Sequence, residues 1–151
     1  TMPVVTVAGA IEGHSYPLGS QPTPSCTTTD ALSGVAVAAT VTVTRDAAGQ
    51  YTASCAGAAD VAGNHAAPAL VRYMVTPAPG TLGTLTDSYV LHSGAPNADG
   101  LSHDLANKLA HGQYCNYIDT VNAQPGGPHP ALTTTQAADL VYWARILDPT
   151  C

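Results

Sequence analysis

The four cysteines are the residues of this sequence whose chemistry follows most directly from type and spacing. Cys26 and Cys55 lie in the first half of the chain, and Cys115 and Cys151 lie in the second. None belongs to a CxxC pair, the spacing that metal sites and redox-active dithiols commonly use. An even number of widely spaced cysteines favours disulfides, which form in oxidising compartments. We therefore expect an extracellular protein that is secreted or displayed at the cell surface.

Two other groups have the residue types of a catalytic site without its spacing. Ser102, His103 and Asp104 are consecutive, and consecutive helical residues point about 100° apart, so they cannot form a Ser-His-Asp relay with one another. His111 and Cys115 are four residues apart and would suit an imidazole and thiolate pair on one helical face. A disulfide at Cys115 removes that thiolate. We expect no catalytic residue and no enzymatic activity.

Carboxylates at turns are the candidates for metal ligands. Asp30 precedes Ala31-Leu32-Ser33-Gly34, and Asp60 precedes Val61-Ala62-Gly63-Asn64. A turn aspartate accepts backbone N–H bonds, whereas Ca²⁺ takes six to eight oxygen ligands, and few oxygens are evident here. We favour turn formation and expect no cofactor, with calcium near Asp30 and Asp60 as the alternative.

An aromatic pair is the candidate ligand contact. Tyr142 and Trp143 are adjacent, and aromatic rings of this kind can stack on sugars. Trp143 also lies at helical spacing from Leu140 and Leu147, which is typical of a core position. Core packing is the favoured reading for Trp143, and glycan contact by the pair is the alternative.

Charge and hydropathy exclude two classes of partner. The chain carries 4 Lys and Arg against 10 Asp and Glu, a formal charge of -6, and its basic residues are scattered. Phosphate-tracking proteins need a basic stripe, so we expect no nucleic-acid partner. A membrane span needs roughly 18 consecutive apolar residues, and polar residues or glycine interrupt every apolar stretch sooner. We expect no membrane span.

Alternating residues in the first half predict strands. Valine or alanine alternates with alanine or threonine over residues 35–44, and Tyr51, Ala53 and Cys55 continue the alternation beyond a turn at residues 45–50. This pattern indicates a half-buried hairpin. With further strands near Val5 and over residues 70–75, it predicts an antiparallel β-sandwich over residues 1–76. A bond between Cys26 and Cys55 would tie one part of the sheet to another.

Proline and glycine at residues 76–80 mark a boundary. We expect a linker over residues 77–97, in which residues 82–91 form either a short strand or an extended segment. Leucines four residues apart then predict one interrupted helix or two short ones from residue 101, and Thr133 to Gln136 has the form of a capping box ahead of another helix. Residues 98–151 should thus form a disulfide-stapled helical hairpin, giving an α+β protein.

This boundary favours one of the three pairings that four cysteines allow, namely Cys26 with Cys55 and Cys115 with Cys151. In the loop-entropy model, the first bond contributes about 3 to 4 kcal/mol. The sequence opens at Thr1 almost directly into a strand, so we expect either that a signal peptide has been removed or that the chain is a piece of a longer precursor.

Two segments resemble known families. The Asp30 to Val35 stretch, the Thr-Val-Thr-Val-Thr strand ending at Thr44 and Ala59-Asp60-Val61-Ala62-Gly63-Asn64 resemble bacterial immunoglobulin-like repeats of secreted actinobacterial proteins. That resemblance implies a spacer, an adhesive module or an appendage of a secreted enzyme, and some such domains bind calcium at their junctions.

Residues 98–151 are similar to the FIMAH domain, a small helical module near the C-termini of secreted bacterial proteins. The resemblance rests on residues 105–109, Cys115-Asn116-Tyr117-Ile118, residues 121–124, residues 132–137, Ala144 and Cys151. Tyr117 stands where a Phe is usual, and Pro128-His129-Pro130 replaces a Gly-Lys turn. The resemblance implies a fold and a context, without catalytic residues.

These observations together predict a non-catalytic, extracellular pair of accessory modules that spaces, attaches or stabilises a larger secreted bacterial protein or enzyme. Its partners would be the rest of that protein and a surface or glycan. One alternative is a structural subunit of a cell-surface or extracellular filamentous assembly, which would form a homo-oligomer or filament. A second alternative is a small secreted hydrolase with an unrecognised site.

Overall fold

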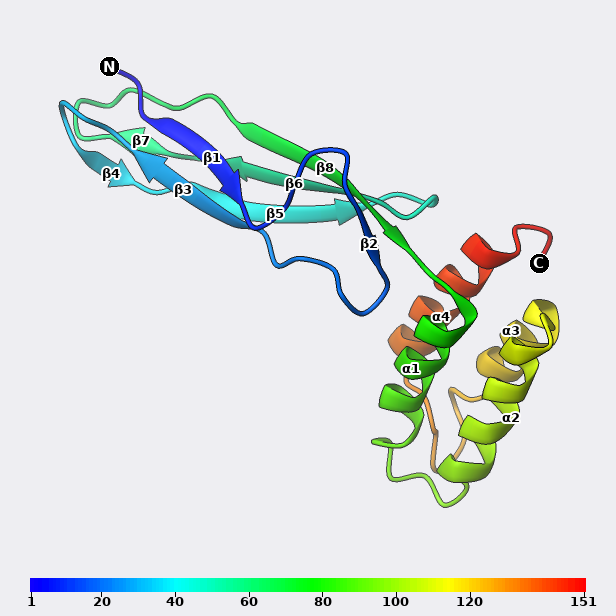
Figure 1. Cartoon of the computed structure of the whole chain (residues 1–151). Helices are drawn as coiled ribbons and strands as arrows, with labels where there is room; N and C mark the ends of the chain where they lie inside the picture. Colours follow the sequence, from blue (N-terminus) through cyan, green and yellow to red (C-terminus); the bar gives the residue numbers. More distant parts are fainter. The chain divides into compact units, whose positions relative to one another are not determined.

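The computed structural model describes residues 1–151 and has an α+β fold in two compact units (Figure 1). The strand unit comprises residues 1–16 and 20–75, and the helical unit comprises residues 17–19 and 76–151. All strand pairs are antiparallel, and the helices follow the strands in the chain. Each unit is described separately below.

The strand unit contains one four-stranded and two two-stranded sheets. The larger sheet has the strand order β2-β8-β6-β5, and the others are β1-β3 and β4-β7. The strands are β1 (Val4–Ala8), β2 (Ser15–Pro17), β3 (Ser25–Thr29), β4 (Val35–Val37), β5 (Thr40–Arg45), β6 (Gln50–Ala56), β7 (Ala59–Asp60) and β8 (Ala69–Thr76).

The β5–β6 hairpin is closed by an aspartate. Asp46 donates its N–H to the carbonyl oxygen of Gln50 over 3.0 Å. Its Oδ1 accepts the N–H groups of Ala48 and Gln50 at 2.8 and 2.9 Å. Gly49 adopts a φ of 84°, which a β-carbon would disfavour. The turn predicted at residues 45–50 therefore has a specific local cause.

The half-buried strand predicted over residues 35–44 is wrong in two respects. Ala38 and Ala39 interrupt it, so β4 and β5 pair with different partners, β7 and β6. All six residues of β5 are exposed, including Val41 and Val43. Alternation reports the pleat of a strand, whereas burial depends on what covers each face, and β5 lies at the edge of its sheet.

The core of the strand unit is small. Its buried apolar side chains are Ala53, Cys55, Ala58, Tyr73 and Val75. The ring of Tyr73 stacks on Tyr51 with centroids 5.4 Å apart and meets Tyr16 edge-on at 5.6 Å. Burial and the two neighbouring tyrosines raise the pKa of the Tyr73 hydroxyl above its ordinary value. Tyrosine contacts and a disulfide thus provide much of the packing in a core that otherwise contains mainly small side chains.

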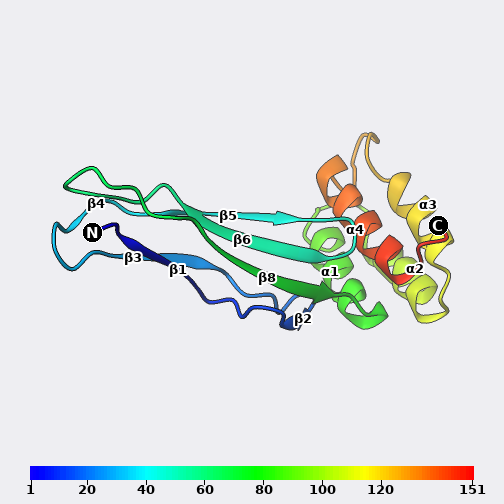
Figure 2. The same ribbon diagram turned by 90° about the horizontal axis from the view of Figure 1, so that it is seen from above.

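The helical unit contains four helices. They are α1 (Pro79–Val90), α2 (Ala98–Ala110), α3 (Tyr114–Asn122) and α4 (Thr134–Leu147). Helix α1 packs against α2 and α4, and α3 packs against α2 and α4 (Figure 2). Gly112, with a φ of 67°, separates α2 from α3, so the interrupted pattern corresponds to two short helices. None of the helices is both long and apolar enough to cross a bilayer.

Helix α1 occupies residues for which a strand or an extended segment was expected. Pro79 stands at the start of the helix, where its missing N–H costs nothing, and the Thr81 hydroxyl bonds the backbone of Ala78. Leu82, Thr86 and Val90 are buried at a spacing of four. Glycine and threonine are poor helix formers, so burial of this face overrides the local preference. The predicted helical hairpin is in fact a four-helix unit.

Leu18 belongs to the core of the helical unit although it lies far from the helices in sequence. It is 4% exposed, and its N–H donates to the carbonyl oxygen of Thr76 over 3.0 Å. The remaining core is built from large side chains of all four helices and the residues before α4. It includes Leu82, Val90, Leu105, Leu109, Tyr117, Ile118, Val121, Leu132, Leu140, Val141 and Trp143.

Candidate functional site

The first pair of cysteines forms a disulfide between two sheets of the strand unit. Cys26 lies on β3, opposite Val7 of β1, and Cys55 lies on β6. Their α-carbons are 5.6 Å apart, and Cys55 is fully buried. This is the pairing that the module boundary favoured. A disulfide with one sulfur in the core is a structural element and offers no nucleophile.

The second disulfide joins Cys115 of α3 to Cys151, with α-carbons 5.2 Å apart. Together with Asp148, these residues place three potential metal-ligand atoms within 4.8 Å of one another. Both sulfurs are oxidised, so neither can act as a thiolate ligand. The Asp148 carboxylate accepts the hydroxyl and N–H of Thr150, which lower its pKa. The disulfide and the Asp148 carboxylate therefore hold the residues after α4 in place.

The same bond removes the imidazole and thiolate pair considered for His111 and Cys115. No cysteine of the chain is free. His111 follows α2, and its Nδ1 lies 2.8 Å from the carbonyl oxygen of Asn107, so the ring is engaged with its own helix end. The arrangement provides no activated sulfur.

Asp30 is held as a turn former. Its Oδ1 accepts the N–H groups of Leu32, Ser33 and Gly34 at 3.0, 2.7 and 2.9 Å. Partial burial raises the pKa of this carboxyl, but these three N–H groups and the Ser33 hydroxyl outweigh that effect, so the pKa is lowered. One oxygen is thus already occupied by the backbone.

Asp60 closes the second predicted turn and is 2% exposed. Its Oδ2 accepts the Asn64 side-chain amide at 2.7 Å and the Ser33 hydroxyl at 2.9 Å, while Oδ1 accepts the Asn64 N–H at 2.7 Å. The Asn64 amide is the main cause that lowers the pKa of Asp60 to about 2. Ser33 contacts both carboxylates, so the two turns form one network whose oxygens already serve protein donors.

The Ser102-His103-Asp104 segment lies on α2 and does not converge on a site. Ser102 is buried and donates to Asp87 of α1, whereas Asp104 pairs with Lys108 along the same helix. His103 is exposed. The serine therefore bonds a carboxylate with no imidazole between them, and a hydrolase relay is absent at this segment.

The aromatic pair lies on α4, with ring centroids 4.7 Å apart and an interplanar angle of 78°. Trp143 is 1% exposed, in agreement with its helical spacing, whereas Tyr142 is half-buried. A ring that is fully enclosed presents no face on which a sugar can stack. A glycan contact would accordingly fall to Tyr142, whose ring meets that of Trp143 edge-on.

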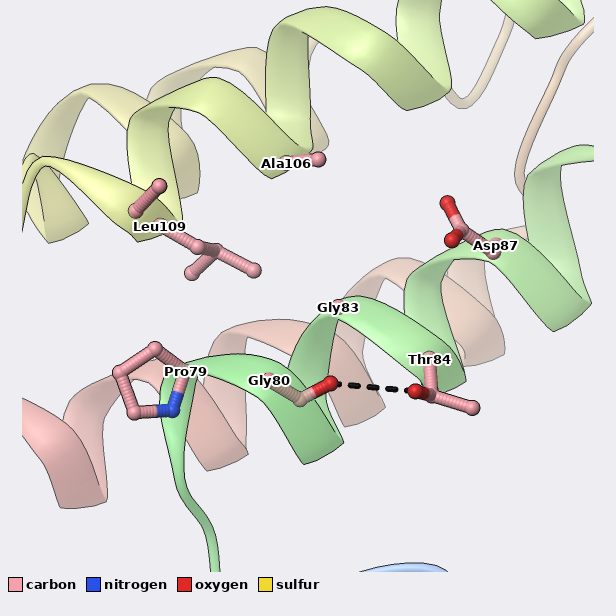
Figure 3. Close-up of a pocket in the computed structure, with 8 residues that line it drawn as sticks. Pro79, Gly80, Gly83, Thr84, Asp87, Ala106 and Leu109 are labelled. Atoms are coloured by element: carbon pink, nitrogen blue, oxygen red, sulfur yellow. Dashed lines mark hydrogen bonds between the residues drawn. The ribbon is translucent and has the colours of Figure 1, made fainter.

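A groove between α1 and α2 is a feature that sequence reasoning missed (Figure 3). It has a volume of about 280 Å³ and is lined by Pro79, Gly80, Gly83, Thr84, Asp87, Ala106, Leu109 and Ala110. The Thr84 hydroxyl donates back to the Gly80 carbonyl oxygen at 3.1 Å, and Asp87 lies at the end of the groove opposite Pro79. The groove was missed because α1 was not expected; small residues at Gly80, Gly83 and Thr84 were its only signal.

Every buried side-chain nitrogen or oxygen has a hydrogen-bond partner. Comparison with protein-family models, with curated proteins and with solved structures gave no match.

Proposed function

We propose that the chain is a non-catalytic, extracellular pair of accessory modules that attaches a larger secreted bacterial protein to a glycan-bearing surface. The observation that carries this proposal is the division into two units, each with its own core and its own disulfide. Disulfides of this kind suit an oxidising compartment, and separately cored units suit a modular appendage.

The polar residues of the chain support a structural role in the same way. The carboxylates of Asp30, Asp46 and Asp60 close turns, and the Tyr117 hydroxyl bonds Thr86 inside the helical core at 2.7 Å. Groups that an enzyme would direct at a substrate are here directed at the backbone or at each other. We further propose that the strand unit is immunoglobulin-like and that the helical unit is FIMAH-like, on the residues that resemble those families.

A binding and turnover experiment tests the attachment role. The intact chain should be retained on insoluble cell-wall glycan, cellulose or chitin, and it should turn over no ester, glycoside or phosphoester substrate. Tyr142→Ala should reduce retention about fivefold or more, since stacking on the half-buried ring contributes on the order of 1 kcal/mol or more.

Tyr114→Ala is the matched control, because Tyr114 is also a half-buried tyrosine of the helical unit. Equal losses in both variants would show that retention does not use Tyr142. Turnover of any substrate would overturn the non-catalytic assignment, and lack of retention on every glycan would overturn the attachment role.

A second candidate role, as a subunit of an extracellular assembly, is favoured by apolar side chains on the surface of the strand unit. Val37, Val41, Val43 and Leu70 are between 42% and 53% exposed. Val41 and Val43 share one face of β5, and exposed apolar side chains that lie next to one another can mark a contact surface. Electron microscopy of concentrated protein distinguishes this role, since a filament-forming subunit gives fibres and an accessory segment does not.

A further inference from the structure

Strand β5 leaves one edge of the four-stranded sheet open. In the order β2-β8-β6-β5 it pairs only with β6, and Figures 1 and 2 both show it as the outer strand of that sheet. Natural proteins protect such edges with proline, lysine, bulges or inward-pointing charges. The segment Thr40-Val41-Thr42-Val43-Thr44 has none of these, and its register with β6 is regular.

The hairpin geometry identifies the backbone groups that point away from the sheet. Asp46 donates to the Gln50 carbonyl oxygen, so this pair is of the hydrogen-bonded type. Hydrogen-bonded and non-hydrogen-bonded pairs alternate along an antiparallel ladder. The groups that face β6 therefore belong to Thr40, Thr42 and Thr44, and those that face outward belong to Val41 and Val43.

The side chains next to these outward groups are apolar and half covered. Val41 pairs with Cys55 and Val43 pairs with Ala53, so the four side chains share one face of the sheet. Cys55 and Ala53 are 0% exposed, whereas the two valines are each 42% exposed. The apolar layer of the sheet thus continues to the open edge, where the two valines remain partly exposed.

We propose that β5 is a self-association surface and that a second copy of this chain pairs with it, strand to strand, about a two-fold axis through Thr42. The sequence of β5 supports a second copy, because Thr-Val-Thr-Val-Thr reads the same in both directions. Antiparallel pairing about Thr42 sets Val41 against Val43 of the partner on the apolar face, and Thr42 against the partner's Thr42 on the other face.

The register fits the open backbone groups. Val41 and Val43 of each copy would exchange about four ladder hydrogen bonds with their counterparts, because they form the hydrogen-bonded pairs of the new ladder. Thr42 would then form a non-hydrogen-bonded pair with its counterpart, the arrangement that brings two side chains closest. At Ala39 the Thr28 hydroxyl already accepts the backbone N–H at 2.9 Å, which ends the open edge.

Charge does not oppose this pairing locally. No charged residue lies between Asp30 and Arg45. In the proposed register, Arg45 of each copy lies opposite Ala39 of the other, so the two guanidinium groups are about 20 Å apart along the ladder, beyond a Debye length of about 8 Å. A two-fold contact uses the same edge of both copies and closes the assembly as a dimer, which distinguishes it from a filament.

Cysteine cross-linking tests the register. Thr42→Cys should form an interchain disulfide under mild oxidation, because the two α-carbons would lie within the range of about 4.4 to 6.8 Å that a disulfide spans. Thr44→Cys is the matched control on the same face of β5. Its two copies would lie four residues apart, about 14 Å, so we expect cross-linking at least tenfold slower. Equal rates, or faster cross-linking of Thr44→Cys, would overturn the proposed pairing.

Sedimentation equilibrium tests the association without an added cysteine. The unmodified chain should approach twice its mass of 15.2 kDa as its concentration rises. Val43→Pro should remain monomeric, because proline removes an outward N–H and leaves the bonds to β6 intact. Leu70→Ser removes another exposed apolar side chain, on β8, and should leave the dimer unchanged.

Circular dichroism of both variants verifies that they fold. An unmodified chain that stays monomeric at millimolar concentration, or a Leu70→Ser variant that dissociates as fully as Val43→Pro, would overturn the inference. The inference does not rest on the attachment role, since retention on glycan and dimer mass are measured separately.

Discussion

The helical unit and the strand unit differ in what holds them together, although they are similar in length. Of the twenty buried apolar residues, fifteen belong to the helical unit and five to the strand unit. The fifteen include tryptophan, tyrosine and six leucines, whereas the five include two alanines and one half of a cystine. Apolar burial contributes about 25 cal/mol per Å², so packing stabilises the helical unit far more than the strand unit.

The positions of the two disulfides follow this difference. In the strand unit, Cys55 is fully buried and its bond joins two sheets. In the helical unit, Cys115 is exposed and its bond ties down the segment after α4. In the strand unit, the carboxylates of Asp30, Asp46 and Asp60 also stabilise turns by accepting backbone N–H groups, and the helical unit has fewer such turns. Covalent and local polar contacts thus replace a large core in the strand unit and supplement one in the helical unit.

The largest expected effect comes from removing the central side chain of the larger core. Trp143→Ala should destabilise the helical unit by about 3 to 5 kcal/mol, because it deletes a large buried side chain and leaves a cavity. Residue-resolved hydrogen exchange should show loss of protection in α1 to α4, with β6 and β8 unchanged. Tyr142→Ala, at the half-buried neighbouring position, should cost less. Similar losses in both variants would contradict the assignment of Trp143 to the core.

Replacing both Cys26 and Cys55 by alanine should have nearly as large an effect on the strand unit. Loop entropy alone gives about 3 to 4 kcal/mol for a bridge of this span, a large share of the stability of a unit with so few buried side chains. Hydrogen exchange should then lose protection in β5, β6 and β8 and keep it in α4.

The matched control is the double substitution of Cys115 and Cys151 by alanine. Here the residues after α4 also regain freedom in the folded state, so the cost should fall below about 2 kcal/mol. If this pair cost as much as the first, the proposed contrast between a central and a peripheral disulfide would be wrong.

A smaller effect should follow Tyr117→Phe. The Thr86 hydroxyl donates to the Leu82 carbonyl oxygen at 2.8 Å and accepts the Tyr117 hydroxyl at 2.7 Å. Phenylalanine would fill the same space and leave the Thr86 donor satisfied, so urea unfolding should show a loss of about 0.5 to 1.5 kcal/mol. A loss of 3 kcal/mol or more would show that the hydroxyl matters more than the ring.

The last effect is confined to acid pH and concerns Asp60, whose pKa falls from 3.8 to about 2 in the folded strand unit. A lowered folded pKa adds stability above about pH 4, and this contribution is lost as the pH falls toward 2. Thermal unfolding of the strand unit should therefore shift to lower temperature over this window. Asp60→Asn should reduce that pH dependence, and an unchanged profile would assign the acid sensitivity to other groups.

The helix start and the turns could be predicted from the sequence, because hydrogen bonds between residues a few positions apart determine them. Thr133 and Gln136 form the expected capping box, with bonds of 2.9 and 3.2 Å, and α4 begins there. The hairpin turn at Asp46 and the carboxylates of Asp30 and Asp60 also act within a few residues. Most of the partners are neighbours in sequence, and the bond from the Ser33 hydroxyl to Asp60 is the exception.

The features that were missed depend on distant parts of the chain. Helix α1 contains Gly80, Gly83 and three threonines, and it forms because its buried face meets α2 and α4. The exposure of β5 depends on its place at the edge of the sheet, which alternation does not report. The spacing of Trp143 predicted its burial. The groove beside Gly83 could not be predicted, because one of its walls is helix α1, which was not expected.

The burial of Leu18 has a consequence for the order in which the chain can fold. A ribosome releases Leu18 well before Thr76, whose carbonyl oxygen accepts its N–H, since the two are 76 − 18 = 58 residues apart. At about 5 to 20 residues per second, this delay lasts roughly 3 to 12 s. During translation Leu18 therefore cannot be buried until the helices that form the rest of its core have been synthesised. A fragment that began at Thr76 would lack that piece of its interior.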